Sequence, residues 1–304
     1  MKRLSSRSLQ QLCRSLARTC RQTQIHEKFQ LDQLEPYCVK WDKIRAWRFS
    51  SWKRTLHIHL VNLDRCPERV TEFCDLNRYL TSVSRFPAID GRTLDLDSLV
   101  RRGLVTKDIL TMCTVGAVGN AMSNLTLWEA GIARNQVVTI CEDDAVFNYG
   151  FEACAEKVMK RLPNDWDIIY WGFNFDMFVV YDILPGVSPS IAIFNQEQMR
   201  ARIKEFQTQT IFPQPFKTVW AFGPCCYSIS PKGAKVIKSK ILPLRPRVIP
   251  FPEAKGVPPY SPAWRTVGLD NFINAIHREI SSFVCIPPLV VSKNEPGKST
   301  IQDR

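Results

Sequence analysis

The chain has 304 residues, of which 45% are hydrophobic, 11% aromatic and 23% charged, a composition that excludes an intrinsically disordered chain. Its formal net charge is +12, but residues 1–54 hold 13 Lys and Arg against four acidic residues and so account for +9 of it. The rest of the chain is nearly neutral, which argues against a nucleic-acid groove across the main body.

The first 54 residues form a basic segment that differs from the rest of the chain, and we expect residues 55–304 to form one domain. Between residues 3 and 21, leucines recur on one helical face and arginines on the other, which predicts an amphipathic helix. Three interpretations of this helix stay open. It lies on an anionic membrane surface, it packs against the main domain, or it is a mitochondrial presequence.

Cysteine usage and hydropathy bear on the compartment. The 11 cysteines include no CxxC pair, which is typical of free thiols in a reducing compartment and not of a zinc site. The sequence has no run of about 18 uncharged apolar residues, and its first 25 residues lack the apolar core of a secretory signal. We therefore expect a cytoplasmic protein, with peripheral attachment to the inner membrane face as an option.

From residue 55 onward, short apolar runs alternate with helical stretches, a pattern that predicts an α/β domain. More than half of the 20 prolines fall within residues 184–262, where we expect long connections over one face of the sheet. Gly116 and Gly119 lack the spacing of a phosphate-binding loop and predict instead a helix that packs closely on the sheet. Strands are expected at 56–61, 136–141, 167–171 and 225–230, and helices at 115–130, 152–161 and 231–240.

Three consecutive carboxylates, Glu142, Asp143 and Asp144, come directly after a predicted buried strand. Like charges side by side repel each other, and the repulsion grows as water is excluded. A hard divalent cation such as Mn²⁺ or Mg²⁺ would remove that cost, and ligands bind at the carboxyl ends of strands in open α/β sheets. A metal site and a solvated acidic turn both fit the triplet alone.

Polar residues also come after the first predicted strand. Asn62 and Asp64 could bond a base or ribose, while Arg65 and Arg69 offer planar donor groups for phosphate. A helix start with Pro67 in its first turn and ordinary surface charges fits the same residues.

Asp270 and His277 lie seven residues apart on a predicted helix and so share one face of it. Either side chain could complete a metal site or act as a base. Surface polarity of a helix is the alternative interpretation.

Several of these stretches occur in an order typical of one enzyme family. They are HLVNLDRCPERV at 59–70, RFPAIDG at 85–91, GAVGNAMSNLTLW at 116–128, VVTICEDDAVF at 137–147, DWDIIYWG at 165–172, CYSISPKGA at 226–234 and PPLVVS at 287–292. With them, the chain from about residue 56 to 302 resembles glycosyltransferase family 25, which includes bacterial lipooligosaccharide galactosyltransferases and collagen hydroxylysine galactosyltransferases.

The resemblance implies a GT-A-type, Rossmann-like domain with a mainly parallel sheet, and inverting transfer of galactose or a related hexose from a UDP-sugar. The acceptor would be a hydroxyl of a glycan, a lipid-linked sugar or a protein, and the cofactor Mn²⁺ or Mg²⁺. The acidic triplet corresponds to the metal and diphosphate motif of the family. The donor nucleotide would contact Asn62, Asp64, Arg65, Arg69, Asp90, Ser123, Asn124, Glu142 and Asp143.

The metal would be held by Asp144 with help from Asp143 or Glu142, and His277 is a further candidate ligand. A carboxylate must also accept the proton of the acceptor hydroxyl on the far side of the anomeric carbon. We expect Asp270 in that role, with Asp165 and Asp167 as reserve candidates.

The sequence departs from the family at two positions: Asn124 replaces a usual histidine, and Asn120 replaces a usual cysteine. These departures motivate an alternative hypothesis, a catalytically inactive GT-A-fold protein that serves interactions. A third hypothesis, nucleic-acid binding through residues 1–54, would require an affinity that falls steeply with salt. The active UDP-sugar transferase is the hypothesis that the combined motifs favour, with no nucleic acid as partner.

Overall fold

The computed structural model describes residues 56–249, 264–265, 267–295, 297 and 299–301. The predicted helix at residues 3–21 and the whole basic segment 1–54 lie outside these residues. No described helix combines the length and the apolar character that a membrane crossing requires.

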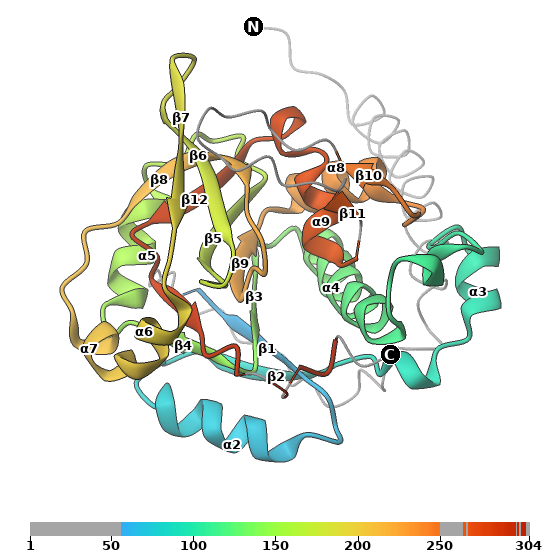
Figure 1. Cartoon of the computed structure of the whole chain (residues 1–304), viewed down its shortest axis with the longest axis horizontal. Helices are drawn as coiled ribbons and strands as arrows, with labels where there is room; N and C mark the ends of the chain where they lie inside the picture. Colours follow the sequence, from blue (N-terminus) through green and yellow to red (C-terminus); the bar gives the residue numbers. More distant parts are fainter. Residues whose placement is uncertain (1–55, 250–263, 266, 296, 298, 302–304) are drawn as a thin grey trace, which may run out of the picture. The chain divides into compact units, whose positions relative to one another are not determined.

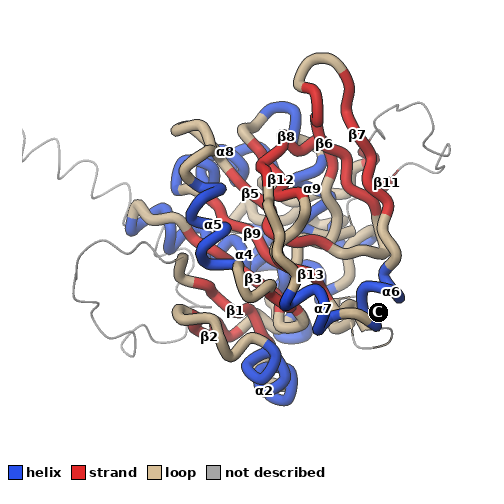
Figure 2. The backbone as a smooth tube through the Cα atoms, turned by 90° about the vertical axis from the view of Figure 1, so that its left-hand side faces the viewer, coloured by secondary structure: helices blue, strands red, loops and turns tan. Residues whose placement is uncertain are grey.

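An 11-stranded mixed sheet forms the centre of the domain, with the strand order β2-β1-β3-β9-β5-β12-β8-β6-β7 and with β13 joining β5 to β4 (Figures 1 and 2). β4, β7, β8 and β9 run opposite to the other strands. The strands are β1 (Ile58–Asn62), β2 (Val83–Pro87), β3 (Val138–Glu142), β4 (Ala145–Phe147), β5 (Ile168–Phe173), β6 (Phe178–Leu184), β7 (Ser188–Ile193), β8 (Gln214–Trp220), β9 (Cys226–Ile229), β12 (Ser282–Ile286) and β13 (Val290–Ser292).

The prediction of a mainly parallel sheet needs correction. β9 enters between β3 and β5 and pairs antiparallel with both, so the sheet is mixed at its centre. Because β3 and β5 each run opposite to β9, they are parallel to each other, and their carboxyl ends reach the same edge. The mixed α/β arrangement fits a Rossmann-like fold. A separate two-stranded ribbon joins β10 (Val248–Ile249) to β11 (Trp264–Arg265).

Helices cover both faces of the sheet. The longest, α4, is almost wholly buried, starts at the side-chain cap of Thr114 and ends at Asn135 in the left-handed conformation. It packs with α8 and α9 (Figure 1). The helices are α2 (Pro67–Leu76), α3 (Leu96–Arg101), α4 (Val115–Arg134), α5 (Phe151–Met159), α6 (Gln196–Ala201), α7 (Ile203–Thr208), α8 (Pro231–Ile241) and α9 (Leu269–Asn274), with short 3-10 turns η3 (Gly91–Thr93), η4 (Ile109–Thr111) and η5 (His277–Glu279).

The main core lies between the sheet and helices α2 and α5. Phe73, Phe147, Phe151 and Trp171 are buried there and meet edge to face, the arrangement that aromatic quadrupoles favour. Tyr170, the neighbour of Trp171 on β5, packs on Tyr227 instead, because successive strand side chains point to opposite faces. The apolar runs of the central strands are therefore explained by burial on both faces.

The strands predicted at 56–61, 136–141, 167–171 and 225–230 and the helices predicted at 115–130, 152–161 and 231–240 occur, with ends shifted by a few residues. The expectation of long connections over 184–262 is wrong for the part that the structure describes, since β7, α6, α7, β8, β9 and α8 fall there. The prolines occupy positions that tolerate them: Pro189 lies on the edge strand β7, and Pro231 opens α8. Proline content alone could not distinguish these positions from loops.

Gly116 and Gly119 lie in α4 as predicted, but they do not face the sheet. A Cβ on Gly116 would come within 2.5 Å of the Thr300 carbonyl oxygen, and one on Gly119 within 2.5 Å of the Ile89 carbonyl oxygen. The glycines therefore allow two loops to approach the start of the helix closely.

Asn77, at the end of α2, ties that helix to β4. Its buried amide donates to the carbonyl oxygens of Phe73 and Ala145, at 3.0 and 2.9 Å, and accepts from the Phe147 N–H at 2.9 Å. β4 comes directly after the acidic triplet, so this side chain fixes the strand that holds the triplet's far end.

Replacing Asn77 with Ala should lower the free energy of unfolding by about 2–4 kcal/mol, because buried backbone groups of β4 lose their partners. Urea unfolding without added metal measures the change. Asn164→Ala, in the exposed loop before β5, is the control and should stay within about 0.5 kcal/mol of the unmodified chain. Equal stability of the two variants would contradict this role of Asn77.

Candidate active site

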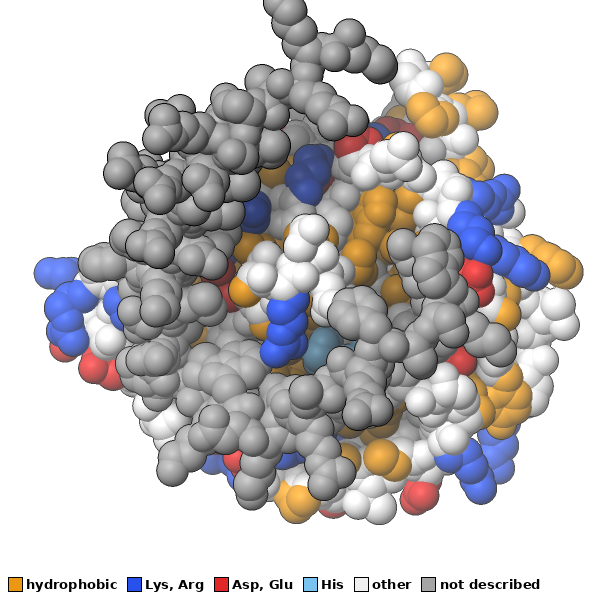
Figure 3. All heavy atoms as spheres, turned by 180° about the vertical axis from the view of Figure 1, so that it is seen from behind, with side chains coloured by type: hydrophobic (Ala, Val, Ile, Leu, Met, Phe, Trp, Pro, Cys, Tyr) orange, Lys and Arg blue, Asp and Glu red, His pale blue; other side chains and the backbone are white. Residues whose placement is uncertain are grey.

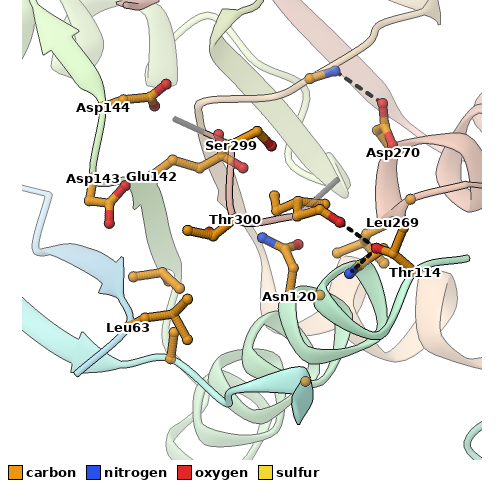
Figure 4. A pocket seen from close by; sticks show the side chains of 18 of the residues that line it. Leu63, Thr114, Asn120, Glu142, Asp143, Asp144, Leu269, Asp270, Ser299 and Thr300 are labelled. Carbon is orange, nitrogen blue, oxygen red and sulfur yellow. Dashed lines mark hydrogen bonds between the residues drawn. The ribbon is translucent and has the colours of Figure 1, made fainter. Parts of the chain in front are cut away.

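A cavity of about 1510 Å³ opens where β1, β3 and β5 end and β9 begins. Figure 4 shows Glu142, Asp143 and Asp144 on one side of it and Asp270 on the other. Carboxyl ends of parallel strands are where open α/β sheets bind ligands. The cavity is thus at the position that the sequence predicts for a site, and it exceeds the usual range of about 300–1,000 Å³ for a small-molecule pocket.

The acidic triplet occupies the turn from β3 to β4. β3 is buried up to Cys141, and the Glu142 N–H donates to the Cys225 carbonyl oxygen at 2.9 Å, which fixes the strand end. Burial, together with the charges of Asp144 and Asp143, raises the pKa of Glu142 well above its usual range. Three carboxylates held this way form a strongly negative site that favours a cation.

Asp143 turns away from its neighbours toward two groups on β1 and α2. Its carboxylate lies 2.5 Å from an Arg69 guanidinium nitrogen and accepts from the Asn62 amide at 2.7 Å. Burial raises the pKa of Asp143, and the Arg69 charge opposes that shift. Asn62, Arg69 and Asp143 therefore form one hydrogen-bonded unit at the cavity wall.

Asp144 is held by the last strand of the sheet. Its Oδ2 accepts from the Ser292 hydroxyl at 2.7 Å and from the Asn294 N–H at 3.2 Å. Its Oδ1 is buried and has no hydrogen-bond partner among the described residues. A buried carboxylate oxygen without a partner is costly unless a ligand completes it.

Basic side chains also line the cavity. Arg65 pairs with Asp90 at 2.9 Å, and both side chains line the cavity. The Asp90 carboxylate also accepts from the Arg92 N–H and caps η3. Lys293 lines the same cavity and pairs with Glu72. Guanidinium and ammonium groups beside an open site are suited to a phosphate-bearing ligand.

Asp270 lies on the first turn of α9 and accepts a hydrogen bond from the Gly223 N–H at 3.1 Å (Figure 4). Burial raises the pKa of Asp270, while backbone N–H groups limit the shift. The sequence places this carboxylate some 130 residues after the triplet, and the fold brings both to one cavity.

The donor set can be tested against a divalent cation. Within the described parts of the chain, no three His, Cys, Asp or Glu side chains converge as a closed metal site would require. Asp144, with one unpartnered oxygen, fits a single protein ligand that leaves open positions for substrate oxygens and water. The triplet thus fits a site that substrate phosphates complete, with Asp144 as its protein ligand.

Five predicted site residues do not line the cavity: Asp64, Ser123, Asp165, Asp167 and His277. The buried Ser123 hydroxyl bonds the Gly119 carbonyl and the Ile89 N–H, so it supports the loop before η3 and contacts no ligand space. Asp64, 78% exposed, pairs with Arg85 on β2 outside the cavity. The structure therefore does not bring either side chain into the cavity, and their contact with a nucleotide stays a prediction.

Asp165 and Asp167 lie just before β5 and so at the opposite edge of the sheet from the cavity. Asp167 is buried and pairs with Lys232 at 2.8 Å, while Asp165 is exposed. Neither carboxylate lines the cavity. A strand's amino end cannot reach the site that forms at the carboxyl ends.

His277 is buried against Tyr170 and does not reach the cavity. α9 ends at Asn274, so the predicted seven-residue helical spacing from Asp270 does not occur. Burial lowers the pKa of His277 to about 3. The structure therefore does not bring His277 to the acidic triplet.

Asn124 belongs to a buried polar chain. Its Oδ1 accepts from the Tyr227 hydroxyl at 2.6 Å, and its amide donates to the Asn120 carbonyl oxygen at 2.9 Å. The Tyr227 oxygen in turn accepts from the Trp128 ring N–H at 2.9 Å. Asn124 and Tyr227 both line the cavity, so the hydrogen-bonded Asn124 amide forms part of its wall.

Sequence reasoning missed residues from β13 onward. Ser292 ends the matched stretch PPLVVS, but nothing in its type pointed to Asp144 across 148 positions. Lys293 and Asn294 come next along the chain and line the cavity. Thr114 also lines the cavity and bonds the Ile301 carbonyl, which brings residues 299–301 to the site (Figure 4).

The face shown in Figure 3 bears Lys and Arg side chains interspersed with acidic and apolar ones among the described residues.

Replacing Asp270 with Asn tests the direction of its pKa. Because burial raises that pKa above 3.8, the folded chain keeps the proton at pH values where the unfolded chain has lost it, and stability falls as the pH rises. The melting temperature of Asp270→Asn should exceed that of the unmodified chain near neutral pH, and the gap should narrow toward about pH 4. Thermal unfolding without metal measures this difference in melting temperature. A difference that grows toward acidic pH would contradict the raised pKa of Asp270.

Comparisons with known proteins identify the family of the chain. The model of glycosyltransferase family 25 (LPS biosynthesis protein) matches residues 55–246. A glycosyltransferase 25 family member of Aedes aegypti is 34% identical over 128 residues, 38% of this chain and 21% of that protein. A similar one of Anopheles gambiae is 32% identical over 126 residues, 38% of this chain and 21% of that protein.

An inactive glycosyltransferase 25 family member 3 of Mus musculus is 29% identical over 147 residues, 43% of this chain and 24% of that protein. The chain thus spans about a fifth to a quarter of the length of these relatives. The family match covers most of the chain, including the acidic triplet and the polar residues after β1. The chain belongs to glycosyltransferase family 25.

Proposed function

We propose that the chain is an inverting, metal-dependent glycosyltransferase with a GT-A-type domain that transfers galactose or a related hexose from a UDP-sugar. The proposal rests on the surroundings of the Asp144 carboxylate. One of its oxygens is held by β13, and the other is buried beside the cavity without a partner among the described residues. Membership of a glycosyltransferase family agrees with transfer chemistry at this site.

The donor nucleotide would bind along the ends of β1 and β2. Asn62, Arg65 and Asp90 offer donors and acceptors for the nucleoside, and Arg69 offers a cation for the diphosphate. Arg69 already neutralises Asp143 at 2.5 Å, so its charge is held at the cavity wall before the donor arrives. A preformed cation of this kind lowers the cost of ordering the phosphates.

The cation would be Mn²⁺ or Mg²⁺, held by Asp144 with help from Glu142. When bound, such an ion neutralises the two donor phosphates and makes UDP a better leaving group. The raised pKa of Glu142 supports this assignment, because the site lacks positive charge that a cation would supply. Asp143 contributes through Arg69, since its carboxylate is engaged there.

Inversion in a single displacement requires a base on the side of the sugar away from the diphosphate. Among the described carboxylates that line the cavity, Asp270 suits this role because it lies across the cavity from the triplet. Its raised pKa makes it a better proton acceptor than an exposed Asp, and the Gly223 N–H fixes its orientation. The acceptor hydroxyl would lose its proton to Asp270 as its oxygen attacks the anomeric carbon.

The acceptor would be a hydroxyl of a glycan, a lipooligosaccharide or a protein. Because the chain spans only about a fifth of the insect relatives, their acceptors are not carried over to it. A lipid-linked acceptor would agree with attachment of residues 3–21 to an anionic membrane surface.

A second candidate function is an inactive member of the family that keeps the fold for interactions. Two observations favour it: Asn124 occupies the position of a family histidine, and a Mus musculus relative is named inactive. The candidates differ in one property, since only the active enzyme couples metal binding to UDP-sugar turnover.

Mn²⁺-dependent hydrolysis of a panel of UDP-sugars tests the active function. Asp144→Ala should reduce the rate at least about 100-fold, because the ligand that orients the metal is lost. Asp165→Ala is the matched control: its side chain is exposed at the far edge, and its rate should stay within about twofold. Unchanged turnover in Asp144→Ala would overturn the metal assignment, and absence of turnover with every sugar would favour the inactive candidate.

Asp270→Asn should lower the rate of transfer to an acceptor by about 10²–10⁴-fold, the usual contribution of a general base. Metal-dependent UDP binding should change by less than about twofold, since Asp270 is not among the residues proposed to contact the diphosphate. Transfer kinetics and calorimetric UDP titration measure the two quantities. A loss of UDP binding equal to the loss of rate would show that Asp270 is not the base.

A further inference from the structure

The two oxygens of the Asp144 carboxylate have different surroundings. Oδ2 accepts two hydrogen bonds, from the Ser292 hydroxyl at 2.7 Å and from the Asn294 N–H at 3.2 Å. Oδ1 is buried and has no hydrogen-bond partner among the described residues. One side of the carboxylate is therefore saturated, and the other is buried without a hydrogen bond from any described residue, on a residue that lines the cavity.

The direction of the Ser292 hydroxyl is fixed by a third contact. The Asn294 N–H lies 3.0 Å from the Ser292 oxygen and donates to it, so the hydroxyl proton is directed to Asp144. Asn294 adopts a positive φ of 40°, which Asn tolerates, and its amide donates to Asp176 at 2.8 Å. Ser292 and Asn294 thus form a compact donor pair around one oxygen.

The strand that carries Ser292 also fixes the backbone of Asp144. β13 pairs with β4, with Ser292 opposite Ala145, and the Lys293 N–H donates to the Asp144 carbonyl oxygen at 3.1 Å. β13 also pairs with β5 at the sheet centre. Main chain and side chain of Asp144 are therefore held by the same rigid element.

We infer that Ser292, with the Asn294 N–H, is a positioning residue that makes Asp144 a one-oxygen ligand for the divalent cation of the donor site. Saturating Oδ2 prevents the carboxylate from rotating or binding through both oxygens, so Oδ1 alone faces the cation. This inference rests on the proposed function. Groups that orient a metal ligand in this way change metal affinity by about 10–100-fold when removed.

Ser292 could instead serve only to satisfy a buried carboxylate. That role predicts a loss of stability without a change in metal affinity, whereas positioning predicts a change in metal affinity in the folded protein. The described chain offers a matched control in Ser282 on β12. It is equally buried, and its hydroxyl makes no hydrogen bond to a described residue, so Ser282→Ala removes the same group without any contact.

The experiment measures the electron paramagnetic resonance signal of free Mn²⁺ during titration of the full chain with saturating UDP. Ser292→Ala should weaken Mn²⁺ binding about 10–100-fold, and Ser282→Ala should leave it within about twofold. Ser292→Thr, which keeps the hydroxyl, should restore affinity to within about threefold. Melting temperatures without metal show that each variant is folded.

If Ser292→Ala does not fold, Ser292→Cys takes its place. The thiol keeps the side-chain volume, is a weak donor, and is a poor ligand for Mn²⁺, so the same weakening is expected. Unaltered Mn²⁺ affinity in a folded Ser292→Ala or Ser292→Cys variant overturns the positioning role. If the unmodified chain with UDP does not bind Mn²⁺, the proposed function itself fails, and the two failures are thereby distinguished.

Discussion

Repulsion among three carboxylates at one strand end is the constraint on which the site depends. β3 delivers Glu142 to the edge of a buried sheet, and the turn to β4 adds Asp143 and Asp144 beside it. The fold relieves this repulsion unevenly: Arg69 neutralises Asp143, β13 binds half of Asp144, and Glu142 keeps a raised pKa. The site still lacks positive charge. A bound cation, together with the basic side chains that line the cavity, would supply it.

Much of the fold could be predicted, because apolar runs and helix caps are local signals. The strands around 56–61 and 136–141 and the helix that begins after Thr114 can be derived from hydrophobic pattern and capping residues alone. The antiparallel insertion of β9 could not, since strand order and direction depend on pairing between distant segments. Proline-rich segments misled for a related reason: an edge strand and a first helical turn accept proline as readily as a loop does.

Some residues of the site could likewise be predicted from the sequence, and others could not. The triplet, Asn62 and Arg69 could be predicted because each lies at or just after a strand that ends at one edge. Asp165 and Asp167 lie outside the cavity because they come before β5, at the amino end of the strand. Ser123 and His277 lie outside it because both are engaged in buried contacts, and Ser292 was missed because its partner lies 148 residues away. Contacts of that separation leave no trace in a single sequence.

The central claim is that the cavity binds a nucleoside diphosphate through a cation held at Asp144. Calorimetric titration of UDP into the chain, with Mn²⁺ and again with a chelator, tests it most directly. We expect binding that is at least about tenfold tighter with Mn²⁺, because Asp144 would hold the metal and the metal would supply positive charge to the phosphates. UDP affinity that is the same in both titrations, or absent from both, would contradict it.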